Sequence, residues 1–152
     1  MGEWDAPWEG NEPTALHKSE VSQALSVAQL DTRQILYIQV TDGPLLGWVN
    51  RYDHDPVGSI VWAGINICQS GSWGQGLGTE ALRLWTDYLF KSLDVTTIKA
   101  GTWSGNMRMI RCAEKCGFVL ANRIPDLREV RGRLYDGLEF TLTRNTHPGI
   151  AC

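Results

Sequence analysis

Hydrophobic and polar residues follow two different periods along the chain, and these periods divide it into strands and helices. β-branched and aromatic residues are concentrated in 34–41 and 45–52, and the Asp-Gly-Pro sequence at 42–44 between them is a turn signal. These two runs predict a β-hairpin, and 57–68 predicts a third strand. In 77–91, by contrast, apolar residues recur every three or four positions, as on the buried face of a helix.

The segments before residue 34 and after residue 91 predict further elements. Residues 1–14 show no period and predict an irregular arm, whereas 15–31 predicts a helix. A short apolar strand is predicted over 95–102. A second helix follows over 106–116, and Gly117 ends it as a left-handed cap.

The last part of the chain, 118–143, predicts closing strands. We expect them to be broken at Pro125, Gly132 and Gly137, with a hairpin near Arg131. The summed order of elements predicts one α+β domain of 152 residues, with a central, mostly antiparallel mixed sheet flanked by helices.

Composition and charge exclude several function classes. The net charge of -3 and the pI of about 5.6 give no bulk attraction to nucleic acid or to an anionic membrane. No apolar run approaches the roughly 20 residues that a membrane helix needs. The cysteines lack CxxC spacing, so we expect reduced thiols in a cytoplasmic protein with no metal site. The cysteines are Cys68, Cys112, Cys116 and Cys152.

The richest chemical signal is the glycine-rich stretch 69–81, which runs into the predicted helix. Glycines let the backbone approach a ligand closely, and the first turn of a helix offers unpaired N–H groups and the positive end of the helix dipole. This combination predicts a cradle for a phosphate or pyrophosphate, held by backbone groups without any lysine or arginine.

Two common phosphate motifs fit this stretch poorly. A Walker P-loop requires Lys-Ser/Thr where Leu77 and Gly78 stand. The dinucleotide fingerprint G-x-G-x-x-A is formally present from Gly76 to Ala81. However, Gly76 lies eight residues past the predicted strand, and no carboxylate ends the next strand. A dinucleotide therefore stays the weaker alternative.

Residues 73–82, Trp-Gly-Gln-Gly-Leu-Gly-Thr-Glu-Ala-Leu, resemble the acetyl-coenzyme A loop of the GNAT N-acetyltransferase superfamily, whose pattern is Q/R-x-x-G-x-G/A. Gly76 and Gly78 match this pattern. Trp73 stands at the Q/R position, as in the branch that includes the ribosomal-protein N-terminal acetyltransferases.

Other segments resemble the same branch in the same order. Residues 106–111 resemble its asparagine-led helix, and 114–118, Glu-Lys-Cys-Gly-Phe, resemble its "EK-x-GF" ending. Residues 46–49 and 132–137 add further matches. The resemblance covers about 35–144 and implies the three-layer GNAT fold with acetyl-CoA as co-substrate.

The resemblance implies a first strand and helix for which this chain has no room. Either the chain starts late, or the place of the first strand is empty or filled by another chain, and an empty place would leave the edge of the sheet unpaired. Such an edge invites association, and a homo-oligomer is a hypothesis. The resemblance also implies that the backbone of 65–67 splays from its neighbour strand and pairs with the pantetheine arm. Asn106 has two interpretations of equal weight, a helix cap and a contact with the cofactor. The residues assigned to cofactor binding are Ile65, Asn66, Ile67, Trp73, Gly74, Gln75, Gly76, Leu77, Gly78, Thr79 and Asn106.

The expected function is acetyl transfer to a primary amine, either a protein N-terminus or a small molecule. A non-catalytic coenzyme A-binding or sensory module is the alternative. In the family a tyrosine often protonates the leaving thiolate, and Ala113 stands at its position here. Ser104 or a water is the candidate acid. Among possible bases, His54 has a suitable ordinary pKa, and an inward-facing Glu139 would have its pKa raised by burial. Further candidate bases are Asp53, Asp55 and Asp136.

Five arginines fall in the final third of the chain. The favoured interpretation is a solvated sheet edge, whereas arginines that face a cleft would select an acidic substrate. They are Arg123, Arg128, Arg131, Arg133 and Arg144.

Overall fold

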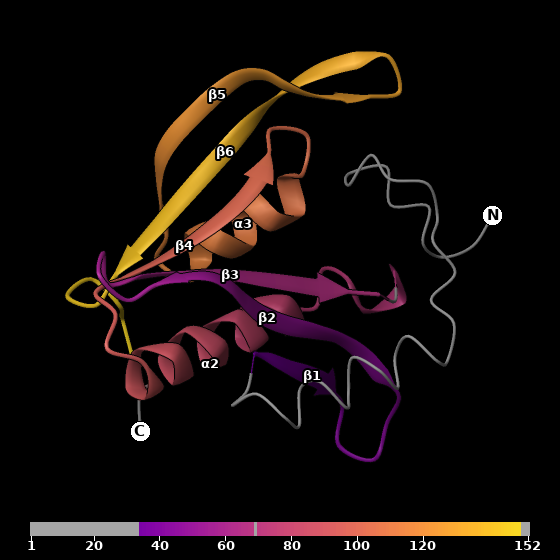
Figure 1. Ribbon diagram of the computed structural model, residues 1–152. Helices are drawn as coiled ribbons and strands as arrows, with labels where there is room; N and C mark the ends of the chain where they lie inside the picture. The colour runs from indigo at the N-terminus through magenta and orange to yellow at the C-terminus, as the bar shows by residue number, and fades with distance from the viewer. Residues whose placement is uncertain (1–33, 69, 150–152) are drawn as a thin grey trace.

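A six-stranded mixed sheet forms the centre of the molecule (Figure 1). The structure is a computed structural model that describes residues 34–68 and 70–149. The strands are β1 (Ile35–Gln39), β2 (Leu45–Asp55), β3 (Ile60–Ile67), β4 (Thr97–Trp103), β5 (Val119–Val130) and β6 (Arg133–Thr143). They lie in the order β1-β2-β3-β4-β6-β5. The β3–β4 pair is parallel and the other neighbouring pairs are antiparallel, which confirms the predicted α+β fold with a mostly antiparallel mixed sheet.

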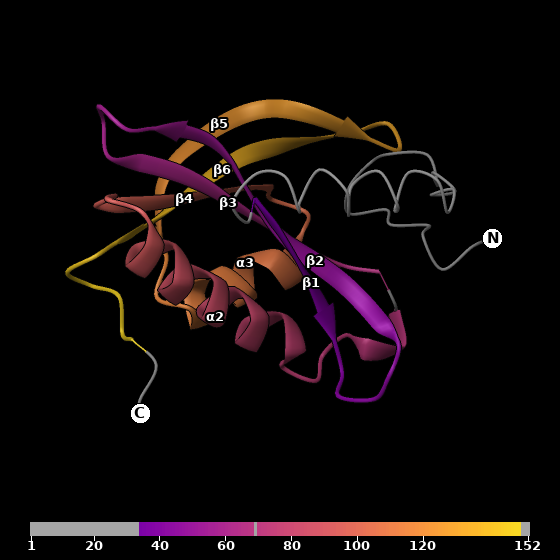
Figure 2. The ribbon, with the colours of Figure 1, turned by 60° about the horizontal axis from the view of Figure 1, so that its bottom comes forward.

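Two α-helices, α2 (Leu77–Ser92) and α3 (Met107–Lys115), lie on the same face of the sheet (Figure 2). A short 3-10 helix, η1 (Ser70–Ser72), precedes α2. Among the described residues no helix is long and apolar enough to cross a membrane. The predicted arm over 1–14 and helix over 15–31 lie outside the described residues, and so does the place of any first strand.

Helix α2 buries the apolar stripe that its sequence predicts. Leu82, Trp85 and Leu89 are almost fully buried against the inward side chains of the sheet. The Trp85 indole N–H also donates to the backbone oxygen of Asn50, 3.0 Å away, so its one polar group is satisfied in the core. This packing fixes α2 as the crossover between the parallel strands β3 and β4.

Both ends of α3 are closed by the residues that the sequence predicts. The side chain of Asn106 accepts a hydrogen bond from the backbone N–H of Met109, at 3.1 Å, so Asn106 is the N-cap. At the other end Gly117 has a φ of 89°, and the N–H of Phe118 donates to the oxygen of Ala113 at 3.0 Å. This is a Schellman motif, which requires the left-handed residue that glycine supplies.

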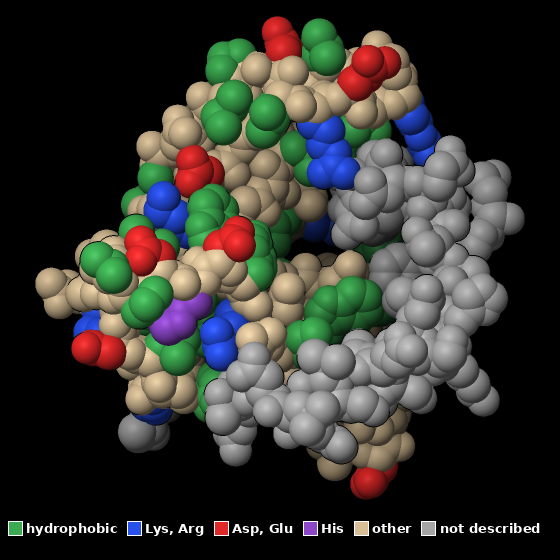
Figure 3. Space-filling view, viewed as in Figure 1, with side chains coloured by type: hydrophobic (Ala, Val, Ile, Leu, Met, Phe, Trp, Pro, Cys, Tyr) green, Lys and Arg blue, Asp and Glu red, His purple; other side chains and the backbone are tan. Residues whose placement is uncertain are grey.

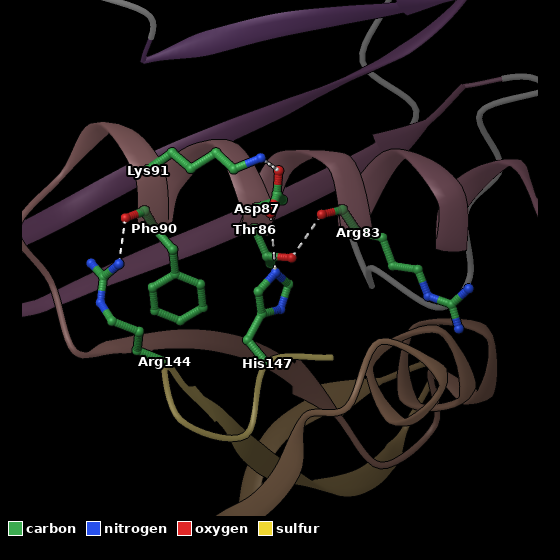
Figure 4. A network of polar contacts seen from close by, with 7 residues as sticks. All are labelled: Arg83, Thr86, Asp87, Phe90, Lys91, Arg144 and His147. Carbon is green, nitrogen blue, oxygen red and sulfur yellow. Dashed lines mark hydrogen bonds and ion pairs between the residues drawn. The ribbon is translucent and has the colours of Figure 1, made fainter. Parts of the chain in front are cut away.

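Arg144 closes the carboxyl end of α2 (Figure 4). Its guanidinium donates to the backbone oxygens of Phe90 at 2.6 Å, Leu93 at 3.1 Å and Val95 at 2.6 Å. His147 packs on the other side of Phe90, with ring centroids 5.1 Å apart. A positive charge at a helix carboxyl end is favourable, so Arg144 holds the helix to the strand that follows it. The expectation of a solvated edge is therefore wrong for Arg144.

The closing strands are less interrupted than the sequence predicts. β5 runs through Pro125, and β6 runs through Gly137. The β5–β6 register shifts between Ile124 and Arg128, so Pro125 lies on an outer strand where no ladder N–H is needed. Gly137 lies under Leu127, whose Cδ2 would be 2.3 Å from a Cβ at that position. This glycine makes room for a crossing side chain and does not end the strand.

Two turns can be compared with their predictions. The polar turn expected at 53–56 is wrong, because β2 continues to Asp55 and the turn occupies 56–59. Asp53 takes a positive φ of 44°, and the register with β3 shifts between Tyr52 and Asp55, so the strand absorbs extra residues as a bulge. The hairpin near Arg131 and Gly132 is confirmed, because both have positive φ as a two-residue turn requires.

Candidate active site

β3 and β4 diverge after a short parallel ladder (Figure 1). The ladder joins Ile60–Trp62 to Thr97–Lys99, and β3 then continues to Ile67 while β4 pairs onward with β6. A cavity of about 770 Å³ opens beside this wedge. The described residues that line it are Gly64, Ile65, Asn66, Ile67, Ser72, Trp73, Gly74, Gly76, Leu77, Gly78, Thr79, Gly101, Thr102, Trp103, Asn106, Arg108, Met109, Arg111, Cys112, Lys115 and Arg128.

The glycine loop forms one wall of the cavity. Gly74 and Gly76 have φ values of 74° and 82°, in the left-handed region that favours glycine, and no atom lies within 4 Å of a Cβ built on either. Gly76 is the N-cap of α2 and supplies no side-chain cap, while Leu77 and Thr79 of the first turn line the cavity. The unpaired N–H groups of this turn therefore offer an anion site.

The predicted cofactor-binding residues gather around this cavity with one exception. Gln75 does not line it, and its side-chain amide instead donates to the backbone oxygen of Gly71 at 2.8 Å. Gln75 thus closes the loop on itself. Asn106 caps α3, as one interpretation predicts, and it also lines the cavity, where the other interpretation expects a contact with the cofactor.

Trp73 ties the loop to β3 and to α3. Its indole N–H donates to the backbone oxygen of Ile67 at 3.1 Å, and the Arg108 guanidinium carbon lies 4.4 Å from its ring centre. Arg111 and Lys115 also line the cavity from α3. These three cations line the same cavity as the predicted backbone cradle, for which the sequence required no lysine or arginine. The 3- and 4-residue spacing of these cations places them on one helix face, and this was the signal available in the sequence.

Cys112 of α3 lies against the first turn of α2. The hydroxyl of Thr79 donates to the Cys112 sulfur at 3.8 Å, and the Cys116 thiol lies 3.4 Å from the Thr79 backbone oxygen. The pKa of the Cys112 thiol is lowered, chiefly by a hydrogen bond from Cys116 and further by Thr79 and the nearby Lys115, although burial opposes the shift. Hydrogen bonding to Cys112 and burial raise the pKa of Cys116 in turn.

The far end of the cavity is lined by Gly64, Gly101, Trp103 and Arg128. Trp103 is 6% exposed, and the Arg128 guanidinium carbon lies 5.7 Å from its ring centre. No described lining residue is Asp or Glu, although the whole chain carries a net charge of -3. The cavity wall is therefore cationic within an acidic protein. Lys and Arg side chains gather beneath the β5–β6 hairpin, beside the hollow (Figure 3).

The structure does not bring His54 or Ser104 into the cavity lining. His54 is exposed near the end of β2 that pairs with Ile60, whereas 65–67 lies at the opposite end of the β2–β3 ladder. The Ser104 hydroxyl accepts a hydrogen bond from the backbone N–H of Asp136 at 3.0 Å, a contact that joins β4 to β6.

Glu139 lies on β6, in register with Gly101 of the cavity wall. One carboxylate oxygen lies 3.4 Å from the Lys99 ammonium, and the other accepts from the Asn122 amide at 3.0 Å. The expectation of a raised pKa is wrong. The hydrogen bond from Asn122 is the main cause that lowers the pKa of Glu139, and Lys99 adds to it against a smaller opposing effect of burial.

The other two predicted bases of the β2 turn, Asp53 and Asp55, are exposed and do not line the cavity. Asp136 pairs with Arg123 at 2.5 Å and accepts from the backbone N–H of Asp126 at 3.1 Å, and these contacts lower its pKa. Asp136 therefore holds the β5–β6 hairpin together.

Residues 2–119 match the acetyltransferase (GNAT) domain family. The match covers well over half of the chain, so this protein belongs to the GNAT family. The family assignment expected from the loop and from α3 is therefore confirmed.

Among individual proteins, an aminoglycoside acetyltransferase is a distant relative of this chain. The chain is 28% identical over 122 residues to aminoglycoside N(6')-acetyltransferase type 1 of Klebsiella pneumoniae, a match that covers 73% of this chain and 61% of that relative. It thus spans about three-fifths of the relative's length.

Two solved structures share the fold. One is spermidine N-acetyltransferase from Vibrio cholerae in complex with CoA and spermine, at a TM-score of 0.74 and 18% identity, over 92% of this chain and 82% of that one. The other is ribosomal-protein-alanine N-acetyltransferase from Brucella melitensis, at a TM-score of 0.70 and 19% identity, over 86% of this chain and 80% of that one.

Proposed function

We propose that this protein is an acetyl-CoA-dependent N-acetyltransferase that transfers an acetyl group to a primary amine. The observation that carries the proposal is a single cavity that joins three features: the glycine cradle at the start of α2, the part of β3 at 65–67 that pairs with β2 but extends beyond the β4 ladder, and the cations of α3. The family's activity and the CoA named for the Vibrio cholerae structure support the same assignment.

The cations that line the cavity and its volume of about 770 Å³ support coenzyme A as the ligand. In this proposal the pyrophosphate takes N–H groups of 74–79, because the N–H of Trp73 already donates to the backbone oxygen of Ser70 at 3.1 Å. Arg108, Arg111 and Lys115 neutralise phosphate charge. Backbone groups of 65–67 on the side away from β2 then hydrogen-bond the pantetheine arm, as a neighbouring strand would. This arrangement places the thioester toward Gly101 and Trp103, at the far end of the cavity.

Acetyl-CoA supplies the thioester, and the coenzyme A thiolate leaves. Because an ordinary thiol has a pKa of about 8.5, this thiolate needs little help from a general acid near neutral pH. The protein's main contribution is then to hold donor and amine together and to exclude water from the wedge. We propose that Glu139, ionised and adjacent to Gly101, removes the proton of the amine through a water. None of Glu139, His54 and Ser104 lines the cavity itself. His54 and Ser104 are the weaker candidates, because His54 is exposed at the opposite end of the β2–β3 ladder and the Ser104 hydroxyl already accepts from the N–H of Asp136.

A non-catalytic coenzyme A-binding or sensory module is the second candidate. It is favoured by one observation, that no Asp, Glu, His or Tyr lines the cavity among the described residues. The rate of thiol release from acetyl-CoA separates the two functions. Adding an amine raises this rate for a transferase, whereas a binding module binds coenzyme A and leaves the rate unchanged.

We further propose an acceptor class, a cellular location and an assembly state for this protein. The acceptor is a protein N-terminus, as the ribosomal-protein branch suggests, or a small molecule, as the relatives' names suggest. The protein is cytoplasmic. It forms a homo-oligomer, which light scattering at working concentration tests, and a monomeric mass would remove this statement.

The deciding experiment compares Gly76→Asp with Gly71→Asp. At Gly76 the change adds bulk, a strained φ and a negative charge at the anion site, so coenzyme A binding by calorimetry and thiol release should both be lost. Gly71 does not line the cavity and has no positive φ, so Gly71→Asp is the matched control. Unchanged coenzyme A affinity in the Gly76 variant would defeat the assignment.

A further inference from the structure

A tryptophan that lines the far end of the cavity carries a buried indole N–H without a hydrogen-bond partner among the described residues. Trp103 lines the cavity and is 6% exposed, and its indole N–H has no hydrogen-bond partner among residues 34–68 and 70–149. Buried polar groups in folded proteins are almost always paired. A donor left unpaired in a ligand cavity points to an acceptor atom that the ligand brings.

The Trp103 ring is held rigidly in this position. Gly105 lies against the six-membered part of the indole, where a Cβ would be 1.9 Å from Cζ3, so no side chain fits between them. The N–H belongs to the opposite, five-membered part of the ring. Tyr135 packs edge-on at a centroid distance of 4.7 Å. The donor is thus pre-organised, which lowers the entropy cost of binding.

Arg128 adds a positive charge beside this donor. It is half-buried, lines the cavity from β5, and its guanidinium carbon lies 5.7 Å from the Trp103 ring centre. Arg128 and the cations of α3 come from different elements, so the cavity carries cations on two walls and no described acidic residue. A guanidinium and a nearby N–H form a suitable pair for the two oxygens of a carboxylate.

We propose that Trp103 and Arg128 select an acceptor that carries a carboxylate close to its amine. This inference rests on the proposed transferase function and specifies its substrate class. A free amino acid and an acidic peptide N-terminus share this chemistry. A polyamine or an aminoglycoside, by contrast, brings only positive charge to a wall that is already positive, and such repulsion disfavours the wrong partner.

The test measures kcat/KM for four acceptors: a free amino acid, a peptide with an acidic N-terminal residue, spermidine and an aminoglycoside. The two carboxylate-bearing arms distinguish the two sources. We expect at least one of them to exceed both polycations by about tenfold, the effect of one charge-assisted hydrogen bond. A preference for spermidine or for the aminoglycoside would overturn the inference and leave the transferase function standing.

A second measurement isolates the contact itself. The preferred acceptor is compared with its amide analogue, which lacks the negative charge, in the wild type and in Arg128→Gln, Trp103→Phe and the control Arg131→Gln. The wild type and the control should discriminate against the amide by about tenfold, whereas the Arg128 variant should lose this discrimination and the Trp103 variant should reduce it. The coenzyme A dissociation constant should stay within about twofold in all variants.

Two results would contradict the assignment of these residues. If Arg128→Gln still discriminates against the amide, the carboxylate contact is wrong. If it weakens coenzyme A instead, Arg128 belongs to the cofactor site and the inference fails. If coenzyme A binds but no amine is acetylated, the transferase function fails as well, and this outcome is distinct from turnover with the wrong acceptor.

Discussion

The guanidinium carbon of Arg108 lies 4.4 Å from the centre of the Trp73 ring, and this contact joins α3 to the glycine loop. The indole N–H of Trp73 is meanwhile bound to the Ile67 backbone oxygen at the end of β3. One side chain therefore positions the loop, the open strand and a cation relative to one another.

Removing this cation should weaken coenzyme A. In Arg108→Gln we expect the dissociation constant to rise about tenfold, because a charged contact to phosphate at an exposed site is lost. Calorimetry at low and at high salt measures this. The wild-type affinity should fall with salt more steeply than that of the variant. Lys91→Gln, which removes a cation from the last turn of α2, is the control. An unchanged affinity in Arg108→Gln would show that α3 does not contact phosphate.

Glu139→Gln should lower kcat/KM by about 100-fold at neutral pH, the usual effect of losing a general base. Because the pKa of Glu139 is lowered, its carboxylate stays charged at every pH above the ordinary glutamate value. The acid limb of the wild-type pH–rate profile should therefore lie below that value. His54→Ala serves as the control and should leave the profile unmoved. A Glu139→Gln enzyme with full activity would exclude this carboxylate as the base.

Arg144→Met should destabilise the fold by about 2–4 kcal/mol. The change leaves the carbonyl groups of Phe90, Leu93 and Val95 without their charged donor and removes a cation from the helix carboxyl end. The midpoint of urea unfolding measures the loss. Arg133→Met, at an exposed site on β6, should change the midpoint little. Equal midpoints for the Arg144 variant and the wild type would mean that this contact does not stabilise the fold.

Cys112 should react with iodoacetamide faster than an ordinary thiol at pH 7, because its pKa is lowered and more of it is thiolate. Coenzyme A should slow this reaction, since Cys112 lines the cavity. Mass spectrometry follows the modification of each cysteine. Cys116 is buried and has a raised pKa, so it should stay unmodified and serve as the internal control. A Cys112 rate that is indifferent to coenzyme A would place the ligand elsewhere.

Local sequence signals account for much of the fold. The cap at Asn106, the left-handed Gly117 and the turn at Arg131 depend on a few neighbouring residues, and each forms as the sequence predicts. The apolar stripe of α2 is equally local. The bulge at Asp53 has no such signal, because an aspartate with positive φ depends on the strand that pairs beside it.

The site is predictable only where one segment forms it. The glycine cradle is continuous in sequence, so its place at the cavity wall follows from the loop and the helix start. Arg128 and Trp103, by contrast, belong to β5 and β4, which do not pair with each other because β6 lies between them. The contact between Arg128 and Trp103 depends on the curvature of the whole β5–β6 hairpin, so the spacing of residues along the chain does not predict it.

The divergence of β3 and β4 leaves two facing rows of amide groups that the sheet does not use between them. A ligand whose own amides bridge these rows would complete the sheet as a non-protein strand. Its arrival would slow hydrogen exchange at the β3 amides beyond Trp62, while the core amide of Val61 stayed as protected as before. Slower exchange at these amides on addition of coenzyme A would show that ligand binding and the local stability of the β3 backbone are coupled.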